Sequence, residues 1–209
     1  MKISLKKSIL FFGLILIVLF LFNVFWSTGF FRTIENKFEG EIFKQIKLKG
    51  AEDITISHID SFAIISSTAR KSFPNIEQER GGLYFLDLKN KNFKLIHLTN
   101  NFKKPFAPHG ISIFKKNNYY IIAAINHTLD GEFIEIFKLT GTKLTHQKSL
   151  KHKLIFSPND IVLFDENKFY FTNDHKYRKG LNRLAEDYLG LSLSNVIYFD
   201  GMRFFEVAN

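Results

Sequence analysis

Residues 108–127, PHGISIFKKNNYYIIAAINH, hold two runs of β-branched and aromatic residues with Lys115-Lys116-Asn117-Asn118 between them. Two such runs around a polar turn that contains Asn predict a pair of antiparallel strands. The layout recurs at residues 51–67, AEDITISHIDSFAIISS, and at residues 158–175, PNDIVLFDENKFYFTNDH. Two further runs of the same kind follow each pair, so each of the three units predicts four strands.

The units begin near residues 51, 108 and 158, about 50 residues apart, which is the spacing of four-stranded propeller blades. The pattern therefore predicts an all-β fold, with about three blades of a β-propeller in residues 51–209. Hairpin turns are expected at Thr140-Gly141-Thr142 and Asp200-Gly201. Asn182 to Tyr188 has helical spacing and predicts a short helix on the loop after His175.

Residues 1–31 predict a membrane anchor. Ile9 to Trp26 contains no charged residue and is about long enough to span a bilayer as a helix. The lysines that precede it (Lys2, Lys6 and Lys7) favour an orientation with the N-terminus inside. The prediction is a single-pass signal-anchor with the rest of the chain on the extracytoplasmic side. A cleaved signal peptide is the alternative, although the apolar segment is long for one and the small-residue cleavage site is poorly matched.

Residues 32–50 predict a connector and a closing strand. Glu35 to Glu41 is polar, whereas Ile42 to Leu48 has the composition of a lone strand. Propellers commonly close by letting an N-terminal strand complete the last blade, because closure leaves no long sheet edge unpaired. We therefore expect residues 42–48 to be half of such a closure.

Composition excludes some classes of function and leaves others open. The chain has 209 residues, 45% of them hydrophobic, and it has no cysteine, which excludes disulfides and thiolate chemistry. The net charge of +9 comes from lysines scattered among Asn, Ile and Phe rather than gathered in one tract. We interpret them as solvated strand edges and turns and expect no nucleic-acid partner.

Polar residues stand at matching positions of the three units. Glu52-Asp53, His109-Gly110 and Asn159-Asp160 open the first strand of each unit, which lines the central channel of a propeller. Carboxylate and amide oxygens suit a hard cation such as Ca²⁺. Histidines near neutral pH are the natural proton carriers, and His127 and His175 end the second strands of two units. Single Asn and Asp residues at strand ends are more often turn formers, but their recurrence at the repeat period favours a site. Three other histidines, in outer strands or connectors, are expected to be solvated: His97, His146 and His152.

Several motifs, in the same order, resemble the serum paraoxonase/arylesterase family. They are PHGIS from Pro108, the Asn126-His127 pair, SPNDIV from Ser157, FYFTNDH from Phe169 and YLGL from Tyr188. The similarity begins at Glu52-Asp53 and continues to Asn209, which covers about three quarters of the chain.

The resemblance implies a six-bladed β-propeller that holds two calcium ions and hydrolyses lactones or aryl esters. By that resemblance, Glu52 and Asn159 bind the catalytic calcium, and Asp53, Asp160 and the carbonyl of Ile111 bind the structural one. His109 is the base that activates water, and His127 is its partner. The resemblance places His175 near the structural calcium.

The sequence departs from the family in one respect. The family's motif series continues with further calcium ligands, whereas this sequence ends at Asn209, after about three units. We therefore expect a partial paraoxonase-like propeller over residues 51–209, whose remaining C-terminal blades belong to a longer protein. Two classes of function stay open: a membrane-anchored, calcium-dependent lactonase or arylesterase, and a non-catalytic binding platform or inactive remnant of the enzyme.

Overall fold

The computed structural model describes residues 5–35, 37–69, 81–90 and 92–209. Within these ranges the helices are α1 (Leu5–Ser27) and α2 (Leu181–Leu189). The strands are β1 (Ala51–Ser57), β2 (Phe62–Ser67), β3 (Gly82–Asp87), β4 (Leu95–His97), β5 (Pro108–Lys116), β6 (Tyr119–Thr128), β7 (Gly131–Thr140), β8 (Lys143–Leu150), β9 (Pro158–Leu163), β10 (Phe169–Asn173), β11 (Asn195–Phe199) and β12 (Phe204–Ala208).

The strands form three four-stranded antiparallel sheets, each made of four consecutive strands: β1 to β4, β5 to β8 and β9 to β12. The prediction of four strands in each unit is confirmed. The hairpin turns lie where they were expected, since Gly141 separates β7 from β8 and Gly201 separates β11 from β12. Both glycines have positive φ, 59° and 103°, a conformation that side chains with a Cβ disfavour.

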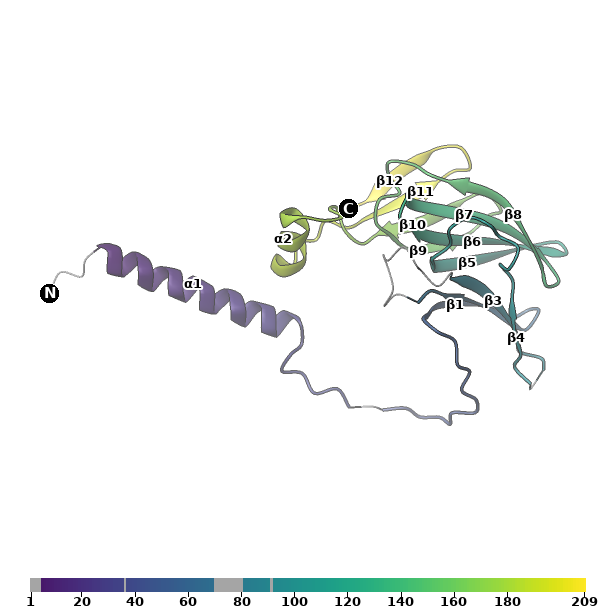
Figure 1. Cartoon of the computed structure of the whole chain (residues 1–209), viewed down its shortest axis with the longest axis horizontal. Helices are drawn as coiled ribbons and strands as arrows, with labels where there is room; N and C mark the ends of the chain where they lie inside the picture. The colour runs from purple at the N-terminus through teal and green to yellow at the C-terminus, as the bar shows by residue number, and fades with distance from the viewer. Residues whose placement is uncertain (1–4, 36, 70–80, 91) are drawn as a thin grey trace.

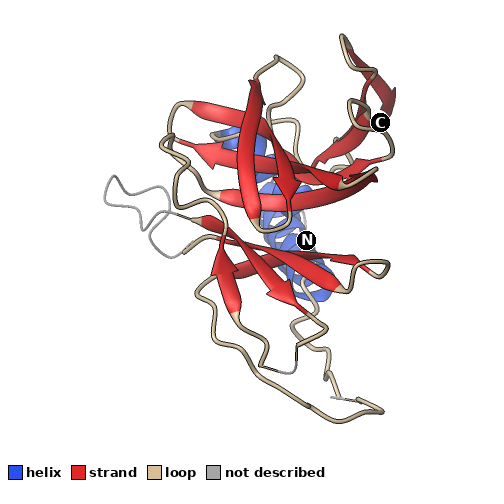
Figure 2. Ribbon diagram, turned by 90° about the vertical axis from the view of Figure 1, so that its right-hand side faces the viewer, coloured by secondary structure: helices blue, strands red, loops and turns tan. Residues whose placement is uncertain are grey.

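The sheet β5–β8 lies between the other two, and β5 packs against both β1 and β9 (Figures 1 and 2). Strand β6 explains this placement. Its residues alternate between two apolar clusters: Ile122 and Ala124 pack toward the first sheet, whereas Ile121, Ala123 and Ile125 pack toward the third. Because successive side chains of a strand point to opposite faces, an unbroken apolar run buries both faces of this sheet.

Residues 42–48 do not form the strand that their sequence predicts. No sheet includes them, and their side chains are almost all exposed. Phe43 makes an edge-to-face ring contact with Phe93 at 6.0 Å. A strand requires a neighbouring edge with which to exchange backbone hydrogen bonds, and each sheet in the described part of the chain already has four strands of its own. The closing role of this segment stays a prediction.

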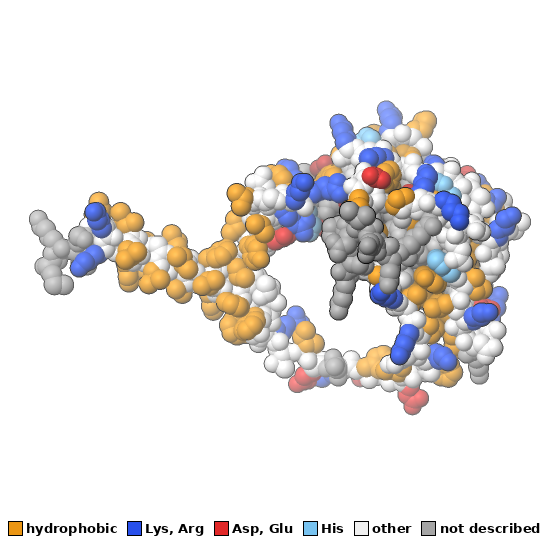
Figure 3. Space-filling view, viewed as in Figure 1, with side chains coloured by type: hydrophobic (Ala, Val, Ile, Leu, Met, Phe, Trp, Pro, Cys, Tyr) orange, Lys and Arg blue, Asp and Glu red, His pale blue; other side chains and the backbone are white. Residues whose placement is uncertain are grey.

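Helix α1 is uncharged from Ile9 to its end, with two lysines in its first turn, and it has no buried residue (Figure 3). Its 23 residues give about 34 Å of helix, slightly more than the roughly 30 Å hydrocarbon core of a bilayer. By length and composition it could cross a membrane, and a signal sequence near an N-terminus meets the same criteria. Helix α2 confirms the short helix predicted at Asn182 to Tyr188 and ends at Gly190, which adopts the left-handed conformation.

Candidate functional site

The polar pairs that open the first strands all lie in β-bulges. Pro108 and Ile111 of β5 pair with Asn126 and Ala124 of β6, so two residues of β5 lie opposite one residue of β6. The same irregularity occurs in β1 between Ala51 and Ile54 and in β9 between Pro158 and Ile161. A bulge bends its strand and redirects side chains out of the ladder. The threefold sequence repeat is therefore also a repeat of bulges, each of which presents a polar pair.

The bulges of β1 and β5 bring Glu52 and His109 together. Glu52 Oε1 lies 2.7 Å from His109 Nε2, and the imidazole side chain is 11% exposed. The rings of His109 and His127 are 5.1 Å apart and inclined at 56°. The structure thus places the two predicted catalytic histidines side by side, with a carboxylate on the first of them.

The other predicted oxygen donors approach β5 from two sides. From β1, Asp53 Oδ2 accepts a hydrogen bond from the Ile111 amide at 2.8 Å. From β9, Asn159 and Asp160 lie so close that a Cβ at Gly110 would be 2.4 Å from the Asn159 carbonyl oxygen and 2.9 Å from Asp160 Oδ1. The two aspartates therefore converge on adjacent residues of β5.

This donor set matches calcium in its chemistry, because calcium takes carboxylate, amide and carbonyl oxygens. Within the described ranges, however, no three His, Cys, Asp or Glu residues form a group that could hold a metal ion. Any metal site here would therefore depend on Asn159 and on backbone carbonyls as well as on the carboxylates.

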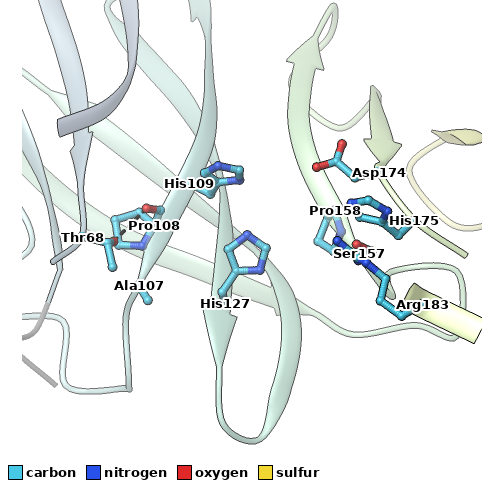
Figure 4. A pocket seen from close by; sticks show the side chains of 10 residues that line it. All are labelled: Thr68, Ala107, Pro108, His109, His127, Ser157, Pro158, Asp174, His175 and Arg183. Carbon is cyan, nitrogen blue, oxygen red and sulfur yellow. Dashed lines mark hydrogen bonds between the residues drawn. The ribbon is translucent and has the colours of Figure 1, made fainter. Parts of the chain in front are cut away.

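A pocket of about 410 Å³ opens beside the histidines. His109 and His127 lie on one side of it, and Asp174, His175 and Arg183 lie on the other (Figure 4). His175 Nδ1 is 3.5 Å from Asp187 Oδ1 and 3.7 Å from Glu186 Oε1, both on α2. The second and third sheets thus contribute opposite walls, and the volume suits a small organic molecule.

Two asparagines of the same sequence motifs have a structural role. Asn126 Oδ1 accepts a hydrogen bond from the Ala107 amide at 2.8 Å, and Asn173 Oδ1 accepts one from the Ser157 amide at 3.0 Å. Each side chain is buried and fixes the segment that leads into a first strand. The partners lie 19 and 16 residues away in sequence, so these two asparagines connect separate segments rather than form turns.

Sequence reasoning missed Glu132 and Arg178. Glu132 Oε2 lies 2.5 Å from His127 Nδ1, and Glu132 Oε1 lies 2.6 Å from Arg178 Nη2. The hairpin could have revealed the first contact, because the two-residue turn between Thr128 and Gly131 places His127 directly opposite Glu132. No local signal in the sequence indicates that Arg178 reaches this pair.

The three outer histidines are not simply solvated, which corrects the prediction. His146 Nε2 lies 2.8 Å from Oε2 of the buried Glu135 and packs against Phe137. His97 stacks on Tyr84, and His152 stacks on Phe204. Neighbouring aromatic rings and a buried carboxylate in the outer strands account for the difference.

Comparison with known proteins identifies the family. The arylesterase family model matches residues 33–209. The chain belongs to the arylesterase family. This arylesterase-family chain is 32% identical to serum paraoxonase/arylesterase 2 of Gallus gallus over 169 residues, which cover 76% of the chain and 47% of the relative. It is 33% identical to serum paraoxonase/lactonase 3 of Homo sapiens over 157 residues, 72% of the chain and 44% of the relative. It is 34% identical to serum paraoxonase/arylesterase 1 of Mus musculus over 162 residues, which cover 72% of the chain and 44% of the relative. The chain thus spans about half the length of the curated relatives it matches.

Proposed function

We propose that this arylesterase-family chain carries the catalytic histidines and calcium ligands of a hydrolase that cleaves carboxylic esters or lactones. The observation that carries the proposal is the pocket whose wall holds the adjacent rings of His109 and His127, next to the bulges that present oxygen donors. The relatives' names, arylesterase and lactonase, indicate the substrate class.

The scaffold we propose is a six-bladed propeller, of which the three described sheets are consecutive blades. Four-stranded antiparallel sheets whose first strands pack side by side support this arrangement. The remaining blades would be supplied by the complete protein. The apolar helix α1 is proposed as an uncleaved single-pass anchor, with the propeller on the extracytoplasmic side, because Lys6 and Lys7 begin the helix.

Two calcium ions are proposed near the bulges. Glu52 and Asn159 would hold the first, and Asp53, Asp160 and the Ile111 carbonyl would hold the second. A bound calcium ion supplies Lewis-acid polarisation of the substrate carbonyl and stabilises the oxyanion. His175, on the far wall of the pocket, is proposed to support the second ion indirectly.

In the proposed reaction, His109 and His127 transfer the proton. An ionised carboxylate only accepts hydrogen bonds, so at 2.7 Å from Glu52 Oε1 the Nε2 atom of His109 carries the proton. In the neutral ring Nδ1 is then the basic atom. It is buried in this structure, and we propose that it takes a proton from water in the reacting complex, where that water becomes the attacking nucleophile. The adjacent ring of His127 receives that proton from His109.

We test the proposal by measuring hydrolysis of phenyl acetate and of a δ-lactone, with calcium and with EDTA, by the purified complete protein in detergent. We expect activity that EDTA removes. Since a general base contributes about 10²- to 10⁴-fold, His109→Gln should lower kcat by that factor, and Asn159→Ala should weaken the calcium dependence. His58→Gln, a change at an exposed histidine outside the pocket, is the matched control.

Full activity in His109→Gln would overturn the enzymatic proposal. Stabilisation of the folded chain by calcium without turnover of any ester or lactone would instead identify a non-catalytic binding platform, the second class that the sequence left open.

A further inference from the structure

A buried carboxylate, that of Glu132, contacts the ring of His127. Glu132 Oε2 is 2.5 Å from His127 Nδ1, and the side chains of His127 and Glu132 are 23% and 10% exposed. The contact joins directly opposed residues of the β6–β7 hairpin. The backbone ladder therefore fixes the distance between the two side chains.

This contact determines which nitrogen of His127 carries the proton. An ionised carboxylate cannot donate, so Nδ1–H donates to Glu132 and the neutral ring keeps its lone pair on Nε2. Without the carboxylate, either tautomer and more than one ring orientation would be available. In the Ser-His-Asp triad, a carboxylate bound to one nitrogen of the histidine holds the ring in the correct tautomer and orientation and stabilises the imidazolium that forms.

The second oxygen of Glu132 has its own partner. Arg178 Nη2 lies 2.6 Å from Glu132 Oε1, and Arg178 belongs to the segment that joins β10 to α2. That segment and α2 contribute His175 and Arg183 to the opposite wall of the pocket. Glu132 therefore joins two elements: Oε2 contacts His127 of β6, and Oε1 contacts Arg178 in the segment that leads to α2.

We propose that Glu132 is a positioning residue for the reaction and that Arg178 holds it in place. Glu132 fixes the ring of His127 so that Nε2 accepts the proton that His109 releases, while Glu132 keeps its charge and accepts the Nδ1–H hydrogen bond throughout. No bond to carbon changes in this step, and only the proton moves. The proposal rests on the proposed function, in which His109 is the base.

Kinetics give the first test, in the purified complete protein with phenyl acetate. At metal-binding histidines, loss of a supporting carboxylate typically costs about 10- to 100-fold in affinity or activity, and we expect Glu132→Gln to lower kcat by a similar factor with little change in KM. Glu132→Asp, which keeps the charge, should recover part of the loss. Arg178→Gln should give a smaller decrease than Glu132→Gln. Glu166→Gln is the matched control, because it removes a carboxylate paired with Lys116 outside the pocket. An unchanged kcat in Glu132→Gln would overturn the proposal.

Nitrogen NMR of histidine-labelled full chain in detergent gives a second test that does not depend on activity. The His127 signals are assigned by their loss in His127→Gln. We expect Nδ1 to be the protonated nitrogen in the parent chain and a mixture of tautomers in Glu132→Gln. The same tautomer in both chains would contradict the proposal even if the enzyme were active. A tautomer change in a chain that hydrolyses nothing would support the positioning role and count against the proposed function.

If Glu132→Gln does not fold, Arg178→Gln serves in its place, because Arg178 is half-exposed and its loss should also broaden the His127 tautomer population.

Discussion

Gly110 shows how closely the first strands approach one another at the level of single residues. A Cβ at this position would come within 2.4 Å of the Asn159 carbonyl oxygen and 2.7 Å of the Asp160 Cα. Both are backbone atoms, so they cannot move aside as a flexible side chain could. The absence of a side chain at residue 110 is therefore what allows Asn159 and Asp160 to reach β5.

Gly110→Ala should consequently destabilise the contact between the second and third sheets. Overpacking of this kind usually costs about 1–3 kcal/mol, and we expect a loss of that size in the free energy of unfolding, measured with urea. Gly13→Ala, in α1 where a Cβ would meet no atom, is the control. Equal stability of both variants would mean that the strands separate easily and that the donors of β9 are not held against β5.

The residues of the site differ in how far the sequence reveals them. Glu52, His109 and Asn159 recur at one position of a repeat, so comparison of the units indicates them. The β-bulges that orient these side chains cannot be recognised in the sequence, because one extra residue changes neither the composition nor the polarity of a strand. Glu132 becomes visible only when the hairpin register is known, since its partner His127 lies across two strands.

At the scale of elements, Asp60 joins two hairpins. It lies in the β1–β2 turn, and its Oδ2 accepts hydrogen bonds from Lys115 Nζ at 2.7 Å and from the Tyr120 hydroxyl at 2.5 Å, both in the β5–β6 hairpin. These hydrogen bonds, that of Lys115 first, hold the pKa of Asp60 below its ordinary value of 3.8. The pKa of Asp60 is thus lower in the folded chain than in the unfolded chain. The ionised carboxylate therefore stabilises the fold at pH values above the unfolded pKa. This stabilisation is lost as the pH falls through the folded pKa.

The contact of the first two sheets should therefore weaken in acid. We expect the unfolding temperature of the parent chain to fall as pH decreases from neutral through the ordinary aspartate pKa of 3.8 and on through the lowered pKa of Asp60. Asp60→Asn should be less stable at the upper end and lose less on acidification. Asp130→Asn, at an exposed aspartate in the β6–β7 turn, should follow the parent. Parallel pH curves for Asp60→Asn and the parent would show that this link contributes nothing to the fold.

Strands were predictable where both partners lie close in sequence. Most neighbouring strands within a unit are joined by short turns, so local composition and turn residues suffice to predict them, whereas longer segments join β2 to β3 and β10 to β11. Residues 42–48 have equally strand-like composition and yet form no strand. Their partner would have to come from far along the chain, and local propensity carries no information about whether that partner is present.

At the scale of the whole molecule, the sequence repeat predicts the four-stranded unit but not how many such units a complete propeller contains. The middle sheet buries both faces against its neighbours through the apolar run of β6, and the two apolar clusters that result join the three described sheets. Closure depends on every blade together, because the first strands define one shared channel. The pairing of Glu52 with His109 across two sheets shows that even one wall of the site is a property of several units.

The position of the molecule relative to a membrane gives the last prediction. The parent chain has no cysteine, so a single introduced thiol reports its location without background. If α1 is an uncleaved anchor with its N-terminus inside, Lys44→Cys in the connector should react with a membrane-impermeant maleimide on intact cells. Lys6→Cys, before the apolar stretch, should react only after permeabilisation, because a basic flank is retained on the inner side. The reverse labelling pattern would place the pocket on the inner side, and a product that lacks α1 would identify the helix as a cleaved signal sequence. Retention of α1 with outward labelling of residue 44 would place the histidine pocket where it meets extracytoplasmic esters and lactones.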